Sequence, residues 1–154
     1  MTVAEKLVEL YKSSGKTCAT AESCTGGGIG AAITSVAGSS EVFLGGVISY
    51  ANEVKHDVLG VAAQVLDEHG AVSSETAAQM AEGARRLTKA DVAVAVTGIA
   101  GPGGGSAEKP VGLVWFGLAT ADGVRTEKAI FPGDREQVRS ATVTHALGML
   151  TTAI

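Results

Sequence analysis

The chain has 154 residues, of which 45% are hydrophobic and 18% are charged, a balance typical of a compact globular protein and unlike that of a disordered segment. A formal net charge of −4 argues against a protein that grips nucleic acid through its phosphates. The first residues lack the pattern of a signal peptide, and the longest uncharged stretch, residues 23–40, is too rich in Gly, Ser and Thr to span a bilayer. We therefore expect a cytoplasmic protein with neither a membrane nor a nucleic-acid partner.

The first half of the chain alternates helical and strand patterns. Apolar side chains at helical spacing mark residues 3–11, and this helix is expected to end at Ser-Ser-Gly. There follow in order a short strand over residues 16–22, a helix over 27–36 and a buried strand over 43–50, which two glycines loosen. Asn52 is then expected to cap a short helix that runs to Leu59.

The second half opens with the clearest helix of the chain. Ser73 or Ser74 is expected to cap it, and its apolar stripe consists of Ala77, Met80, Ala81, Ala84 and Leu87. Residues 91–97 form an apolar run typical of a strand covered on both faces, and a Gly-rich loop over 98–109 follows. The chain then predicts two strands over 111–120 and 124–131, joined as a hairpin at Ala-Asp-Gly, and a last helix from Asp134 or Arg135 to about Thr151.

Helices that alternate with buried strands, together with one hairpin, indicate the fold class. They predict a three-layer α/β/α sandwich on a mixed sheet of about five or six strands. Neither an internal repeat nor a linker interrupts the pattern, so residues 1–154 are expected to form one domain.

Ser23 lies where the first strand pattern gives way to the second helix pattern, in Ala21-Glu-Ser-Cys-Thr-Gly-Gly-Gly. At such a turn a hydroxyl lies near helix N–H groups that have no intrahelical partner and near the positive end of the helix dipole. That environment suits an anion, an oxyanion or a nucleophile. The commoner role of a hydroxyl at this boundary is a helix N-cap, here Ser23 or Thr25.

Tyr50 closes the second predicted strand, and Lys55 follows it five residues later. If that strand lies beside the first, its end and the turn at Ser23 open at the same edge of the sheet. A lysine can deprotonate a serine when burial lowers its pKa, and a tyrosine can relay a proton or orient the lysine. The alternative is a surface Lys55 paired with Glu53 or Asp57, and a Tyr50 that only covers the core.

Other familiar motifs match poorly. Gly15-Lys-Thr lacks the earlier glycine of a P-loop, and Gly26-Gly-Gly-Ile-Gly-Ala fits a dinucleotide-binding turn without the acidic residue expected further on. The three histidines are scattered, and only His56 leaves a histidine-based triad open. The two cysteines, Cys18 and Cys24, form neither a disulfide framework nor a zinc pattern. We expect no metal and no cofactor.

Four motifs follow one another along the chain: Glu22-Ser-Cys-Thr-Gly-Gly, Gly46-Val-Ile-Ser-Tyr-Ala-Asn-Glu-Val-Lys, Val96-Thr-Gly-Ile-Ala-Gly-Pro-Gly-Gly and Phe131-Pro-Gly-Asp-Arg. In this order they resemble the CinA C-terminal domain family, and the resemblance covers essentially the whole chain. Members of that family include nicotinamide-nucleotide amidohydrolases (PncC type), which convert nicotinamide mononucleotide into nicotinate mononucleotide and ammonia. The resemblance implies an α/β/α domain, frequently dimeric, that uses a serine nucleophile with lysine and tyrosine.

The resemblance also implies a role for each matching residue. Ser23 becomes the nucleophile, Lys55 its general base, and Tyr50 an aid to proton transfer onto the departing ammonia. Backbone N–H groups of Thr25, Gly26 and Gly27 are expected to stabilise the oxyanion. Binding of the substrate's ribose phosphate is expected from the loop after the third strand and the start of the last helix, through Thr97, Gly98, Gly101 and Arg135.

Two other functions remain open from the sequence. One is hydrolysis of another small amide or nucleotide on the same scaffold. The other is a non-catalytic nucleotide-binding module linked to competence or DNA damage. In each case the expected partner is a small-molecule nucleotide, and we expect the chain to form a homodimer.

Overall fold

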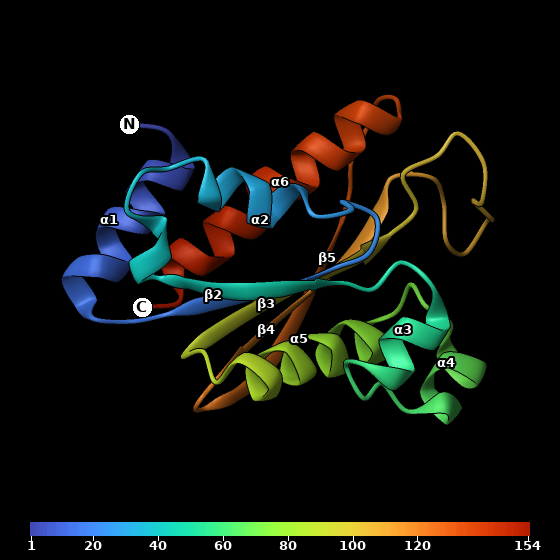
Figure 1. Cartoon of the computed structure of the whole chain (residues 1–154). Coiled ribbons are helices and arrows are strands. Elements are labelled where there is room, and N and C mark those ends of the chain that lie inside the picture. Colours follow the sequence, from blue (N-terminus) through green and yellow to red (C-terminus); the bar gives the residue numbers. More distant parts are fainter.

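The computed structural model describes all 154 residues and shows six helices around one five-stranded sheet (Figure 1). The strands are β1 (Cys18–Glu22), β2 (Phe43–Ile48), β3 (Val92–Gly98), β4 (Leu113–Thr120) and β5 (Gly123–Ile130). The helices are α1 (Val3–Ser14), α2 (Gly28–Thr34), α3 (Asn52–Asp57), α4 (Ala63–His69), α5 (Ser74–Thr88) and α6 (Arg135–Thr152), and a 3-10 turn, η1 (Ser39–Glu41), precedes β2.

The sheet is mixed, with the strand order β2-β1-β3-β4-β5. The first three strands in this order run parallel, and β4 and β5 form the antiparallel hairpin that the sequence predicts. In the parallel part Glu22 pairs with Ile48 on one side and with Val96 on the other. The carboxyl ends of β1, β2 and β3 therefore open at one edge of the sheet, where open α/β sheets commonly bind ligands.

Helices cover both faces of the sheet, which confirms the predicted three-layer sandwich. Figure 1 shows α1, α2 and α6 on one face and α3, α4 and α5 on the other. Along β3 the side chains alternate between two cores, with Val94 and Val96 packed toward the first group and Ala93 and Ala95 toward α5. No helix combines the length and the apolar character needed to cross a bilayer.

Four local predictions differ from the structure. Residues 43–50 are predicted as a buried strand, but β2 is an edge strand with no buried residue, because nothing pairs with its outer side. Asn52 is the first residue of α3 and not its cap. Helix α4 is absent from the prediction, and Leu87, expected in the buried stripe of α5, is 52% exposed.

Candidate active site

Ser23 directly follows β1 and is held by the neighbouring strand. Its N–H donates to the carbonyl of Val96 (3.1 Å), which extends the sheet ladder by one residue. The chain then turns sharply through Gly26 and Gly27, whose φ angles of 59° and 102° lie in the left-handed region that favours glycine. The Ser23 side chain does not cap α2; it lies 8% exposed at the carboxyl edge of the sheet.

The N-terminus of α2 is instead occupied by Glu22, which is 2% exposed. Its carboxylate accepts hydrogen bonds from the N–H groups of Ile29 (2.8 Å) and Gly30 (2.9 Å) and from the Thr25 hydroxyl (2.6 Å). A carboxylate at this end of a helix is favoured by the dipole. Through these hydrogen bonds Glu22 holds the first turn of α2, where the turn that begins at Ser23 ends.

Lys55 projects from α3 and is 1% exposed. Its Nζ lies 3.0 Å from Ser23 Oγ, 2.7 Å from the carbonyl oxygen of Ser49 and 3.0 Å from that of Tyr50. No carboxylate forms an ion pair with it. The structure thus brings Ser23 and Lys55 into contact, and the surface pairing with Glu53 or Asp57 does not occur.

The surroundings of Lys55 make its neutral form more accessible than that of a lysine in water. Burial lowers the pKa of Lys55 from 10.5 to about 8, because the ammonium loses hydration without gaining an anionic partner. A neutral amine has two N–H groups and one lone pair. Because the two carbonyls accept both N–H groups, the lone pair faces Ser23 Oγ and can take its proton.

This geometry predicts that the reactivity of Ser23 rises with pH. A lowered lysine pKa means that the neutral base accumulates as the pH approaches about 8, with about a tenth of it present at pH 7. The rate at which a fluorophosphonate labels Ser23 is therefore expected to rise almost tenfold per pH unit up to pH 7 and to level off above 8. A Ser23→Ala variant controls for labelling elsewhere, and a flat profile from pH 6 to 8 would contradict Lys55 as the base.

Ser23 and Lys55 open into a cavity of about 210 Å³. Its wall comes from the ends of the parallel strands and from the segments that follow them: Ser23, Cys24, Tyr50, Lys55, Ala71, Val72, Thr97, Gly98, Ala100 and Arg135. The Thr97 hydroxyl donates to the carbonyl of Ala71 (2.7 Å) and so holds the segment before α5 against the cavity.

Tyr50 and Arg135 meet at the exposed side of this cavity. Tyr50 is 63% exposed, and its hydroxyl lies 3.4 Å from Arg135 Nη2. Arg135 Nη1 donates to the carbonyl of Gly101 (2.9 Å), so Gly101 holds the arginine and does not itself line the cavity. Tyr50 contacts Lys55 only through its backbone carbonyl.

The other predicted binding residues lie outside the cavity wall. The Thr25 hydroxyl is bonded to Glu22, and the N–H of Gly26 donates to the carbonyl of Ser23 (3.1 Å). Gly27 lines a separate groove between α2 and β2. The hydroxyl of Thr25 and the N–H of Gly26 are thus already bonded within the protein.

Two alternative nucleophile systems are not assembled here. His56 is exposed, and its Nδ1 lies 2.7 Å from the carbonyl of Val61, away from the cavity. Burial raises the pKa of the Cys24 thiol to about 11, so it stays protonated near neutral pH. No cluster of His, Cys, Asp or Glu side chains is arranged to hold a metal ion.

Arg139 of α6 is a site residue that sequence reasoning missed. Its Nε donates to the carbonyl of Cys24 (3.0 Å) and its Nη2 to that of Thr25 (3.0 Å). The sequence feature that could have revealed Arg139 is its spacing of four residues from Arg135, which places both arginines on one face of a helix.

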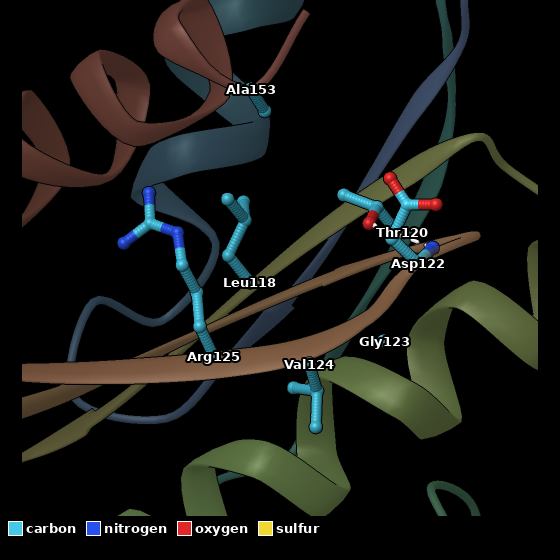
Figure 2. Close-up of a pocket in the computed structure, with 7 residues that line it drawn as sticks. All are labelled: Leu118, Thr120, Asp122, Gly123, Val124, Arg125 and Ala153. Atoms are coloured by element: carbon cyan, nitrogen blue, oxygen red, sulfur yellow. Dashed lines mark hydrogen bonds between the residues drawn. The ribbon is translucent and has the colours of Figure 1, made fainter.

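A second cavity, of about 300 Å³, lies beside the β4–β5 hairpin (Figure 2). Because β4 runs antiparallel to β3, this hairpin is at the sheet edge opposite Ser23. Its lining includes Arg125, Asp122 and Thr120 but no serine, cysteine, histidine or lysine. The Thr120 hydroxyl accepts from the N–H of Asp122 (3.2 Å) and has no hydrogen bond to a basic side chain.

Comparison with known proteins points to one family. The model of the CinA C-terminal domain matches residues 1–154. A CinA-like protein of Geotalea daltonii is 52% identical over 149 residues, which are 97% of this chain and 36% of that protein. A CinA-like protein of Synechococcus sp. (strain RCC307) is 50% identical over 152 residues, 97% of this chain and 36% of that protein. The chain thus spans little more than a third of these curated relatives.

Solved structures agree with that match. The competence/damage inducible protein CihA from Agrobacterium tumefaciens superposes with a TM-score of 0.95 at 47% identity, covering 97% of this chain and 92% of that one. A CinA superfamily protein from Escherichia coli gives a TM-score of 0.94 at 33% identity, covering 99% of this chain and 88% of that one.

Proposed function

This chain belongs to the CinA C-terminal domain family, and from that premise we propose that it is a serine amidohydrolase which converts nicotinamide mononucleotide into nicotinate mononucleotide and ammonia. The observation that carries the proposal is the contact of 3.0 Å between Ser23 Oγ and the buried Lys55 Nζ. Burial lowers the pKa of Lys55 to about 8, and the carbonyls of Ser49 and Tyr50 accept its N–H groups. Lys55 is therefore a base that is oriented toward the Ser23 hydroxyl.

The proposed reaction has two halves. Ser23 Oγ bonds to the carbon of the carboxamide while its proton passes to Lys55 Nζ, which gives a tetrahedral oxyanion. The oxyanion collapses, the C–N bond breaks, and the nitrogen leaves as ammonia with the proton that Lys55 held. Water then attacks the acyl carbon while Lys55 takes one proton from it, the bond between this carbon and Ser23 Oγ breaks, and Lys55 returns the proton to Ser23 Oγ. The acid leaves and loses its remaining proton to solvent, which gives the carboxylate.

The size of the cavity supports binding of the amide-bearing ring next to Ser23. At about 210 Å³ it is smaller than the roughly 300–1,000 Å³ of sites that enclose a whole drug-sized ligand. The nicotinamide ring would fill it, and the ribose phosphate would extend toward the exposed Arg135. A guanidinium at this place suits a phosphate, because its planar fork donates two parallel hydrogen bonds.

Replacing Arg135 with Met tests the phosphate contact. KM for nicotinamide mononucleotide is expected to rise about tenfold or more, with a smaller effect on kcat, because the contact is remote from the reacting bond. The same change is expected to leave the much weaker turnover of nicotinamide riboside, which lacks the phosphate, almost unaffected. Arg125→Met, which changes an exposed arginine of β5 bonded to Glu127 (2.9 Å), is the matched control. An equal loss on both substrates would contradict a phosphate contact.

The substrate itself is tested by product analysis. Purified protein is incubated with nicotinamide mononucleotide, and the proposal expects nicotinate mononucleotide in the chromatogram. If ammonia is released from another small amide and none from this nucleotide, the proposed serine mechanism stands and the proposed substrate is wrong. Binding of the nucleotide without turnover would favour a non-catalytic module.

A further inference from the structure

Two buried backbone N–H groups in the turn after Ser23 have no hydrogen-bond acceptor in another residue. They belong to Cys24 and Thr25, which are only 5% and 1% exposed. The N–H groups of Ser23 and Gly26 donate to the carbonyls of Val96 and Ser23, and those of Ile29 and Gly30 donate to Glu22. The N–H of Gly27 also has no acceptor, but Gly27 is half-buried and lines the separate groove between α2 and β2. Buried backbone N–H groups almost always have a partner, so two unpaired ones beside a nucleophile indicate a place for a ligand atom.

Arg139 fixes the orientation of the peptides that carry this turn. It binds the carbonyls of Cys24 and Thr25 together, each at 3.0 Å. A trans peptide directs its C=O and N–H to opposite sides, and the one cis bond in the chain is elsewhere. With the Cys24 carbonyl held on Arg139, the N–H of Thr25 is turned away from Arg139.

The helices that carry Arg139 and Lys55 lie on opposite sides of the sheet (Figure 1). Helix α6, which carries Arg139, covers one face of the sheet, and α3, which carries Lys55, lies on the side of the other face, which α5 covers (Figure 1). Ser23 lies at the sheet edge between them and is bonded to Lys55. Cys24 lines the cavity, and Thr25 and Arg139 lie outside its wall.

We propose that the N–H groups of Cys24 and Thr25 form the oxyanion hole, and that Arg139 is the positioning residue that holds it in shape. The inference rests on the proposed serine chemistry and not on the identity of the amide. When Ser23 Oγ bonds to the carbonyl carbon, the C=O electron pair moves onto oxygen, and the two N–H groups donate hydrogen bonds to that negative oxygen. The charge is stabilised by dipoles that are already oriented, which is the most effective arrangement.

An arginine suits this position better than a lysine. Its planar fork reaches two successive carbonyls at once, whereas an ammonium acts as a single point on a flexible stem. Since Arg139 acts through the backbone, its loss is expected to affect the reaction at Ser23 without altering the base that activates it.

The test is the rate at which a fluorophosphonate labels Ser23, since this reagent places a phosphonyl oxygen where the oxyanion would form and needs no nucleotide. Arg139→Met is expected to label about 100-fold more slowly than the unchanged protein, and Arg139→Lys at an intermediate rate. The pH midpoint of labelling is expected to stay where it is, because Lys55 is untouched. Arg125→Met is the control, and thermal melting shows that each variant is folded.

Equal labelling rates for Arg139→Met and the unchanged protein would overturn the proposal, and so would a slower rate accompanied by a displaced pH midpoint. If Arg139→Met fails to fold, Arg139→Lys and Arg139→Gln carry the test, and full-rate labelling of both would overturn it. Labelling of Ser23 without hydrolysis of nicotinamide mononucleotide would remove the proposed substrate and leave the oxyanion hole in place. No labelling of Ser23 in the unchanged protein would overturn both.

Discussion

Replacing Lys55 with Met is expected to lower amide turnover by about 1,000-fold or more, because Ser23 loses the only base within hydrogen-bond reach of its hydroxyl. The chain is expected to stay folded, since Met fills similar space and removes a buried amine that gains no anionic partner. Ammonia release measures the loss, and circular dichroism with thermal melting measures the fold.

Lys6→Met is the matched control for this change, because Lys6 is exposed on α1 and has no hydrogen-bonded or ion-paired side chain. Its activity is expected to equal that of the unchanged protein. A Lys55→Met variant that keeps more than a tenth of the activity would show that lysine is not the base, and the neighbouring His56 would then be the next residue to replace.

Replacing Glu22 with Ala is expected to lower the free energy of unfolding by about 3–5 kcal/mol, because two N–H groups of α2 and the Thr25 hydroxyl would lose their acceptor in a buried place. In a chain of this size the melting temperature should fall by roughly 10 °C. Activity is expected to fall as well, because the same carboxylate braces the turn that carries Ser23.

Glu9→Ala, at an exposed position of α1, controls for the loss of a carboxylate as such and is expected to leave the melting temperature almost unchanged. Differential scanning calorimetry of the two variants makes the comparison. A Glu22→Ala protein that melts within a degree or two of the unchanged one would show that Glu22 does not hold the turn.

The pairing of Ser23 with Lys55 was within reach of sequence reasoning because parallel strands end at the same edge of a sheet. β1 and β2 are neighbours in parallel, and the residues after both strands meet there. The burial of Lys55 was not within reach. Its helix reads Asn-Glu-Val-Lys-His-Asp, a polar segment, and only the packing of α3 against the sheet edge removes Lys55 from water.

The errors have similar causes. An edge strand and a central strand both read as short apolar runs, so nothing in Phe43–Ile48 revealed that β2 is outermost. Helix α4 has no buried residue and hence no apolar stripe to detect. The oxyanion donors expected at Thr25, Gly26 and Gly27 stay a prediction: the N–H of Gly26 is already bonded to the carbonyl of Ser23, and the proposed pair of donors keeps Thr25 and adds Cys24.

The most direct test of the central claim is ammonia release from nicotinamide mononucleotide by the purified protein and by its Ser23→Ala variant, side by side and without added metal. The proposed function predicts release by the unchanged protein and none above background by the variant, because the variant lacks the hydroxyl that lies 3.0 Å from Lys55 Nζ. Equal release by both proteins would contradict a serine mechanism, and no release by either would contradict the proposed amidohydrolase.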